Sequence, residues 1–331
     1  MRSQVMRSHV TRSRLRTTIV ALVGLLWAAG APFAGGAWAQ DYPSRPINMV
    51  IPFPPGGNTD LMARALQPEL AKALGQPIVV VNKGGAGGTI GDIEVASARL
   101  DGYTIGLTPN NPVTAQPHIQ KLPYDLASFR YVCLTYDVPY VLIGSPRAPF
   151  ASFNEFLAFT KAKNDNLIYA SPGPGTQPHL GILAVLGAIK AEGVHVPFTG
   201  AGPMSQALLA GTVMAMAESP AVAKASNLRV LAALSKTRIG ALPDVPTMAE
   251  LGYPAEAFTA GGIIVPAKTP DAVVARLQKA CAAAVASDGY KSASDKLNAI
   301  ARYLPESEFK ALYEADSVRN AEAVKKAGIT Q

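Results

Sequence analysis

The sequence predicts a mixed α/β protein that is long enough to form two lobes. Segments typical of strands alternate with segments typical of helices, and two successive units near the start each join a strand, a glycine-rich loop and a helix. About 290 residues follow the N-terminal leader described below, which is enough for two domains of ordinary size.

The first unit starts with the apolar run Ile47–Ile51, which suits a buried central strand. Two prolines and two glycines at positions 54–57 end this strand and permit a sharp turn. Asn58 or Thr59 is expected to cap the helix that follows, and Asp60 falls in its first turn. Such a loop directs unpaired backbone N–H groups at one point, where an anion can bind.

The second unit has a strand at Pro77–Val81, a loop at Asn82–Gly88 and a helix that begins near Thr89. Right-handed crossovers place the carboxyl ends of parallel strands at one edge of a sheet, so both helix N-termini should meet there. The plainer alternative is that both loops are simple tight turns. The spacing of Gly84–Gly88 fits neither a dinucleotide fingerprint nor a P-loop, so a small carboxylate suits the site better than a nucleotide.

Residues 1–39 have the features of an export signal. Five arginines precede an apolar run from Thr17 to about Ala34, and Ala37-Trp38-Ala39 offers small residues for cleavage after Ala39. Cleavage would leave the mature protein in the periplasm, and an uncleaved membrane anchor is the alternative. Without the five arginines the net charge falls from +7 to about +2, which argues against nucleic acid as a partner.

The chain contains two cysteines, too few for a disulfide framework. Cys133 lies in an apolar, strand-like run and Cys281 in an alanine-rich helix. We expect two buried thiols, although export makes a single disulfide the alternative.

The remaining elements continue the alternation of strands and helices. Ser152 is expected to open a helix with a capping box closed by Glu155, and Pro68 should kink the first helix or divide it. Further strands are expected at Tyr103–Thr108, Tyr131–Ile143, Leu167–Ser171, His195–Phe198, Val213–Met216, Arg229–Ser235 and Ile263–Val265. Two long helices should begin near Pro270 and near Glu306, the second running to Ala327 with Gly328 as its stop.

The second half of the chain carries two further strand-to-helix loops. Ser171–His179 contains a glycine-rich turn with hydroxyl groups at Ser171 and Thr176, and Val196–Gly202 contains another turn. Their hydrogen-bond donors are neutral. These two loops would form one wall of the ligand site, and this wall can orient a ligand without adding charge.

Taken in order, these motifs resemble the Bug (TctC-like) family of periplasmic solute-binding proteins, the receptors of tripartite tricarboxylate transporters. The resemblance covers essentially the whole mature chain. It rests on Arg45–Ile47, Phe53–Gly57, Asp60, Asn82, Gly85–Gly88, Gly91, Asp101–Thr104, Leu122–Asp125, Ser171, Gly173, Gly175, Thr176, His179, His195–Phe198, Leu242–Thr247, Pro266 and Pro270.

The resemblance implies a two-lobed type II periplasmic-binding-protein fold with the ligand held in a cleft between the lobes. Residues 40–144 and 266–331 would form the first lobe, and residues 145–265 the second. It also implies a receptor that captures a small carboxylate and delivers it to membrane permease subunits. We further expect a monomer without cofactor or metal. The ligand would contact Phe53, Pro55, Gly56, Gly57, Asn58, Asp60, Ala86, Gly87, Gly88, Thr89, Ser171, Thr176, His179, Phe198, Thr199, Gly200, Ala201 and Glu218.

Two departures from the family pattern bear on the ligand. Phe198-Thr199-Gly200 stands where the family often has Tyr-Lys-Gly, and Met214 stands where an acidic residue is frequent. An ammonium group would therefore lack its usual partner unless Glu218 takes that role. A plain mono- or dicarboxylate, aromatic acids included, is expected rather than an amino acid.

Several of these residues also have a purely structural interpretation. Asp60 either reaches a ligand through water or only stabilises the helix dipole, and Arg64 and Lys83 are expected at the solvated surface. The histidines lack metal-ligand spacing, so His179 and His195 are expected to be structural unless the family role holds.

Two other functions compete with that of a transport receptor. A periplasmic hydrolase could use Ser171 or His179, but the chain has no G-x-S-x-G motif, and we expect no enzymatic activity. A sensor module that docks on a signalling receptor is the other alternative, and the sequence does not separate it from a transport receptor.

Overall fold

The computed structural model describes residues 42–162 and 167–329. The predicted export signal lies outside these residues. No helix within the described ranges is long and apolar enough to cross a membrane.

The first half of the sheet is built from parallel strands that the sequence located correctly. Strand β1 (Ile47–Ile51) pairs in parallel with β2 (Ile78–Asn82) on one side and with β3 (Thr104–Pro109) on the other. The apolar side chains of β1 are buried on both faces of the sheet, as expected for a central strand. Both glycine loops therefore leave the sheet at the same edge.

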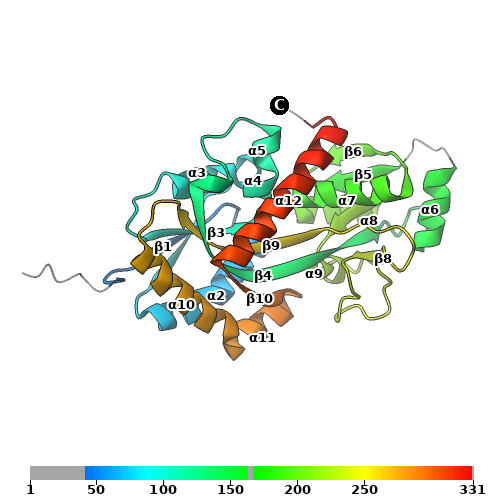
Figure 1. Ribbon diagram of the computed structural model, residues 1–331. Helices are drawn as coiled ribbons and strands as arrows, with labels where there is room; N and C mark the ends of the chain where they lie inside the picture. The colour runs from blue at the N-terminus through cyan, green and yellow to red at the C-terminus, as the bar shows by residue number, and fades with distance from the viewer. Residues whose placement is uncertain (1–41, 163–166, 330–331) are drawn as a thin grey trace, which may run out of the picture. The chain divides into compact units, whose positions relative to one another are not determined.

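Strand β4 (Phe129–Gly144) joins this half to a second one. Its first part pairs with β9 (Phe258–Pro266) and β10 (Ile300–Pro305), and its last part pairs with β7 (Ala215–Glu218) and β8 (Arg229–Leu234). The order of the main path is β2-β1-β3-β9-β4-β7-β5-β6. One long strand thus belongs to both halves (Figure 1).

The second half repeats the parallel arrangement of the first. Strand β5 (Ile168–Ser171) pairs in parallel with β6 (Val194–Pro197) and with β7. The carboxyl ends of these three strands consequently share an edge, where the second pair of loops begins.

Helices follow most strands, and separate hydrophobic clusters form under them. The first helix continues through Pro68 as one element, so of the two expected outcomes, a kink or a division, the division does not occur. The described helices are α2 (Asn58–Leu74), α3 (Thr89–Ala96), α4 (Asn110–Thr114), α5 (Gln116–Ile119), α6 (Phe153–Lys161), α7 (Gln177–Ile189), α8 (Ala201–Ala210), α9 (Pro220–Ala225), α10 (Asp271–Ala286), α11 (Asp288–Lys296) and α12 (Glu306–Lys326), with short 3₁₀ turns η1 (Ala86–Gly88) and η2 (Leu126–Ser128).

The observed helix ends agree in part with those predicted from the sequence. Gly57, not Asn58 or Thr59, is the N-cap residue of α2. The Asp60 carboxylate in the first turn accepts the Gly56 N–H instead, as described below. The Ser152 side chain accepts the Glu155 N–H at the start of α6, which confirms that cap.

Helix α12, red in Figure 1, packs against β4, β10, α4, α5 and α7. Its buried Asp316 carboxylate accepts hydrogen bonds from Asn110 at 2.8 Å and from Thr114 at 2.7 Å, both in α4. A small apolar cluster that includes Ile119 of α5, Leu180 of α7 and Val324 of α12 lies farther along the helix. The C-terminal helix thus links the segment after β3 to the second half of the sheet.

The expectation of two free thiols was wrong, because Cys133 and Cys281 form a disulfide. The bond joins the first part of β4 to helix α10, with 6.6 Å between the two Cα atoms. Both cysteines are fully buried in the same core cluster. The sequence placed each cysteine in its element, but it could not reveal that α10 packs on β4 at the level of Cys133.

Candidate functional site

The first glycine loop is held by the buried carboxylate of Asp60. Asp60 is 1% exposed and accepts hydrogen bonds from the Gly56 N–H at 2.9 Å, the Asn82 side-chain amide at 2.9 Å and the Arg64 guanidinium at 3.0 Å. Burial acts to raise the pKa of Asp60, but the hydrogen bonds from Arg64, Gly56 and Asn82 outweigh it, so the pKa lies below its usual value. Asp60 therefore shapes the loop as an ionised brace.

The second glycine loop packs directly on the first. Asn82 Nδ2 donates both to Asp60 Oδ1 and to the Phe53 carbonyl at 3.0 Å. A Cβ atom at Gly88 would lie 3.1 Å from the Phe53 ring, and one at Gly84 would lie 2.9 Å from Pro54. These close approaches explain the glycines, and they bring the two loops together as the sequence predicts.

A third segment at this edge was not identified from the sequence. Helices α4 and α5 follow β3, and the Gln116 side chain in α5 lies against Gly87 of the second loop. Asn111 in α4 donates a hydrogen bond to the carbonyl of Gly175, which belongs to the second half of the chain. The polar run Asn110-Asn111 directly after a buried strand was the signal that could have revealed it.

Ser171 and Thr176 use their hydroxyl groups within their own loop. Ser171 Oγ accepts the Gly173 N–H at 3.1 Å and lies 2.6 Å from His195 Nε2. The Thr176 hydroxyl donates to the Gly173 carbonyl at 2.8 Å. Both side chains therefore stabilise the turn that precedes α7.

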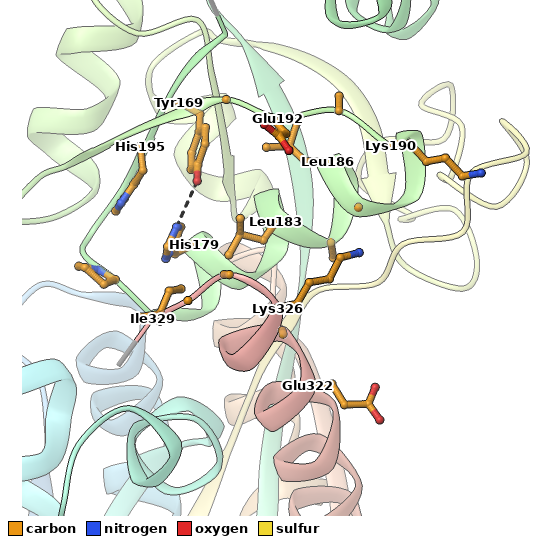
Figure 2. Close-up of a pocket in the computed structure, with 18 of the residues that line it drawn as sticks. Tyr169, His179, Leu183, Leu186, Lys190, Glu192, His195, Glu322, Lys326 and Ile329 are labelled. Carbon is orange, nitrogen blue, oxygen red and sulfur yellow. Dashed lines mark hydrogen bonds between the residues drawn. The ribbon is translucent and has the colours of Figure 1, made fainter. Parts of the chain in front are cut away.

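His179 is also part of this internal network. Its Nδ1 accepts the Gly175 N–H at 3.0 Å, and its Nε2 lies 3.3 Å from the Tyr169 hydroxyl (Figure 2). Its ring stacks on that of His195, with 4.0 Å between the centroids. Burial, together with repulsion from His195, lowers the pKa of His179 to about 3, so the ring is neutral near pH 7. Both ring nitrogens are engaged, as expected for a structural histidine.

The last candidates lie at the ends of β6 and β7. The Phe198 N–H donates to the Ser171 carbonyl at 2.9 Å, which sets the loop that leads through Thr199 and Gly200 into α8. Glu218 Oε1 accepts the Ser219 N–H at 2.7 Å, and burial raises the pKa of Glu218 to about 6. Because β5, β6 and β7 are parallel, their carboxyl ends lie at one edge of the sheet. Phe198 and Glu218 therefore lie at the same edge as Ser171.

Two large cavities lie apart from the glycine loops of the first half. One, of about 1180 Å³, is lined by α7, β5, β6 and the end of α12, and His179 is the one predicted ligand residue that it contains (Figure 2). The other, of about 690 Å³, is lined by parts of β4, β8, β9 and α11, and contains none of them. Within the described part of the chain, no group of three His, Cys, Asp or Glu side chains could hold a metal ion.

Comparisons with known proteins fit this architecture. A family model described as the tripartite tricarboxylate transporter family receptor matches residues 62–328. Protein BugT of Bordetella pertussis strain Tohama I is 40% identical over 247 residues, which cover 72% of this chain and 75% of BugT.

Solved structures show the same two-lobed α/β fold. The periplasmic binding protein BugD matches with a TM-score of 0.76 and 33% identity, over 87% of this chain and 99% of BugD. MatC from Rhodopseudomonas palustris, solved with bound malate, matches with a TM-score of 0.75 and 30% identity, over 86% of this chain and 100% of MatC. The chain therefore belongs to the Bug (TctC-like) family of periplasmic solute-binding receptors.

Proposed function

We propose that this protein captures a small carboxylate in the periplasm and delivers it to the permease subunits of a tripartite tricarboxylate transporter. The observation that carries the proposal is the meeting of two glycine loops, braced by Asn82 and Asp60, at the carboxyl ends of β1 and β2. The malate bound to MatC supports a carboxylate as the ligand class.

Some backbone N–H groups of the two glycine loops already make hydrogen bonds within the protein, so fewer of them are available to the ligand. The N–H groups of Gly56, Gly88 and Thr89 bond to Asp60, Gly85 and Ala86 respectively. The N–H groups of residues 57–59 and 86–87 are therefore the donors that we assign to the ligand. A micromolar ligand needs about 8 kcal/mol, and hydrogen bonds to a charged group contribute roughly 1.5–3 kcal/mol each, so several of these donors suffice.

The second wall favours a plain mono- or dicarboxylate over an amino acid. The loop Phe198–Ala201 supplies neutral groups, and Glu218 is the one acid among the ligand residues expected from the second half of the chain. Its Oε1 already accepts the Ser219 N–H, so part of its capacity to accept hydrogen bonds from an ammonium group is used within the protein. The aromatic Phe198 is compatible with an aromatic acid.

The lobe boundaries, export and oligomeric state are part of the same proposal. We place the first lobe at residues 40–144 and 266–331 and the second at 145–265, with β4 and β9 as the strands that connect the two lobes. Cleavage after Ala39 would release the protein to act as a monomer.

A ligand screen tests the proposal. The mature protein, residues 40–331, is heated with mono-, di- and tricarboxylates, aromatic acids and amino acids at pH 7. A ligand present at one hundred times its Kd should add about 2.7 kcal/mol to the free energy of unfolding and raise the melting temperature. If a folded sample responds to no acid, the proposal is wrong.

One observation favours hydrolysis as a second candidate. Ser171 Oγ and His195 Nε2 lie 2.6 Å apart, a serine–histidine pair that spacing alone did not suggest. However, Ser171 is fully buried, and its Oγ also accepts the Gly173 N–H. Recovery of the bound acid, and of its methyl ester, chemically unchanged after incubation would exclude this candidate.

A further inference from the structure

One amide group contacts the glycine loops of both halves of the chain. Gln116 is 4% exposed and begins helix α5. A Cβ atom at Gly87 would lie 2.7 Å from Gln116 Nε2, and one at Gly175 would lie 3.9 Å from the same nitrogen. Gly87 and Gly175 both have a φ of 68°, and Gly175 is held in place by the hydrogen bond from Asn111 to its carbonyl.

The hydrogen bonding of this amide is incomplete. Gln116 Oε1 accepts a hydrogen bond from Gln120 at 2.9 Å. Its Nε2, which carries two N–H groups, donates to no acceptor among residues 42–162 and 167–329. In this part of the chain, the fully buried side-chain atoms without a hydrogen-bond partner are Asp92 Oδ2 and Ser205 Oγ. Gln116 Nε2 is not one of them. Nε2 thus keeps some exposure to solvent, whereas most of the side chain is buried.

We propose that Gln116 is a ligand-binding and specificity-determining residue, whose Nε2 donates a hydrogen bond to a carboxylate oxygen of the bound acid. The inference rests on the proposed function and adds to it a residue outside the loops. The amide lies beside Gly87, one of the N–H donors assigned to the ligand, and beside Gly175 from the opposite wall.

The chemistry of the amide defines what it selects. Because Oε1 already accepts a hydrogen bond from Gln120 and Nε2 has no acceptor in the described residues, the amide faces the ligand chiefly as a donor. An ionised carboxylate accepts such donors, whereas the ammonium group of an amino acid does not. Gln116 therefore selects for a carboxylate end at this position and against a cationic one.

The test replaces the amide by a carboxylate of the same shape. Wild type and Gln116→Glu are titrated calorimetrically with malate, succinate and benzoate at pH 8 and pH 5. At pH 8 the variant should bind the responsive acid roughly ten to one hundred times more weakly than wild type, since a donor is replaced by a like charge. At pH 5 partial protonation of the introduced carboxylate should reduce this ratio at least several-fold.

Matched variants separate binding from folding. Gln206→Glu makes the same change at an exposed position of α8 and should bind like wild type. Gln116→Met removes the donor without adding charge, so it should weaken binding equally at both pH values. Comparing each titration with wild type at the same pH removes the contributions of the ligand and of the other titrating groups. Melting temperatures identify any variant that does not fold.

The outcomes distinguish the two claims. If wild type binds an acid and both Gln116 variants bind it equally well at pH 8, the inference is overturned and the proposed function stands. If Gln116→Glu is weaker than wild type by the same factor at pH 5 and at pH 8, Gln116 only packs and the inference also fails. If wild type binds none of the three acids, the carboxylate-binding claim and the inference fall together.

Discussion

At the scale of single residues, Asp92 is the least expected side chain in the molecule. It lies in α3 directly after the second glycine loop and is fully buried. Its Oδ1 accepts a hydrogen bond from the Thr108 hydroxyl, and its Oδ2 has no partner in the described residues. Burial raises the pKa of Asp92 to about 8, with the bond from Thr108 opposing this shift. The folded protein therefore holds a proton here at neutral pH.

This proton makes stability depend on pH in a predictable direction. An aspartate in the unfolded chain titrates near pH 3.9, so between that pH and about 8 the folded state binds one proton more than the unfolded state. The free energy of unfolding should fall as pH rises through this window, by up to about 1.4 kcal/mol per pH unit from Asp92. Asp92→Asn should remove that slope, as measured by urea unfolding at pH 5, 6, 7 and 8.

The exposed Asp244 provides the control for this prediction. Asp244→Asn should leave the pH dependence of the wild type unchanged. A variant at Asp92 with the same slope as wild type would show that this carboxyl is ionised in the folded state, contrary to our interpretation.

Residue roles in the candidate site were only partly readable from the sequence. The glycine spacing predicted where the two loops begin, since glycine is required wherever φ is positive or a neighbouring backbone approaches. The role of Asp60 remained open between the helix dipole and a water-mediated ligand, because its partner Asn82 lies at the end of β2, 22 residues away along the chain. Gln116 was missed because its contacts with Gly87 and Gly175 exist only after the chain has folded.

At the scale of elements, the disulfide ties α10 to the long strand β4. The two cysteines are 148 residues apart, so the bond closes a large loop in the unfolded chain. Removing such a constraint typically costs 2–5 kcal/mol, chiefly through the entropy of the unfolded state in the chain-entropy account. Reduction with dithiothreitol should therefore lower the melting temperature clearly.

The double variant Cys133→Ala, Cys281→Ala supplies the comparison. It should melt at a lower temperature than the oxidised wild type, and reductant should not change its melting temperature. An oxidised wild type that contains two reactive thiols after unfolding, by thiol titration in denaturant, would contradict the disulfide.

Elements with strong local patterns were predicted, and elements defined by tertiary contacts were not. Strands β1 and β2 and the long helices α10 and α12 carry apolar runs or clear end signals, and the structure confirms them. Strand β10 is half exposed and exists by pairing with β4, so its sequence has no distinct strand pattern. Helices α4 and α5 are too short for helical periodicity to show.

At the scale of the whole molecule, two α/β halves share one strand and place their loops at strand carboxyl ends. The sequence predicted this fold class, because alternating strands and helices leave few topologies open. It did not reveal that α12 would link α4 to α7, or that Asn111 would bond across to Gly175. Contacts between distant segments depend on how the helices and strands align when they pack. Local sequence patterns do not encode this alignment.

The most direct test of the account is a crystal structure of the mature protein with the acid that gives the largest thermal shift. We predict a carboxylate oxygen at hydrogen-bond distance, about 3 Å, from backbone nitrogens of residues 57–59 and 86–87. An acid bound instead in the cavity lined by Tyr169, His179 and Lys326 would contradict the assignment of the two glycine loops as the ligand site.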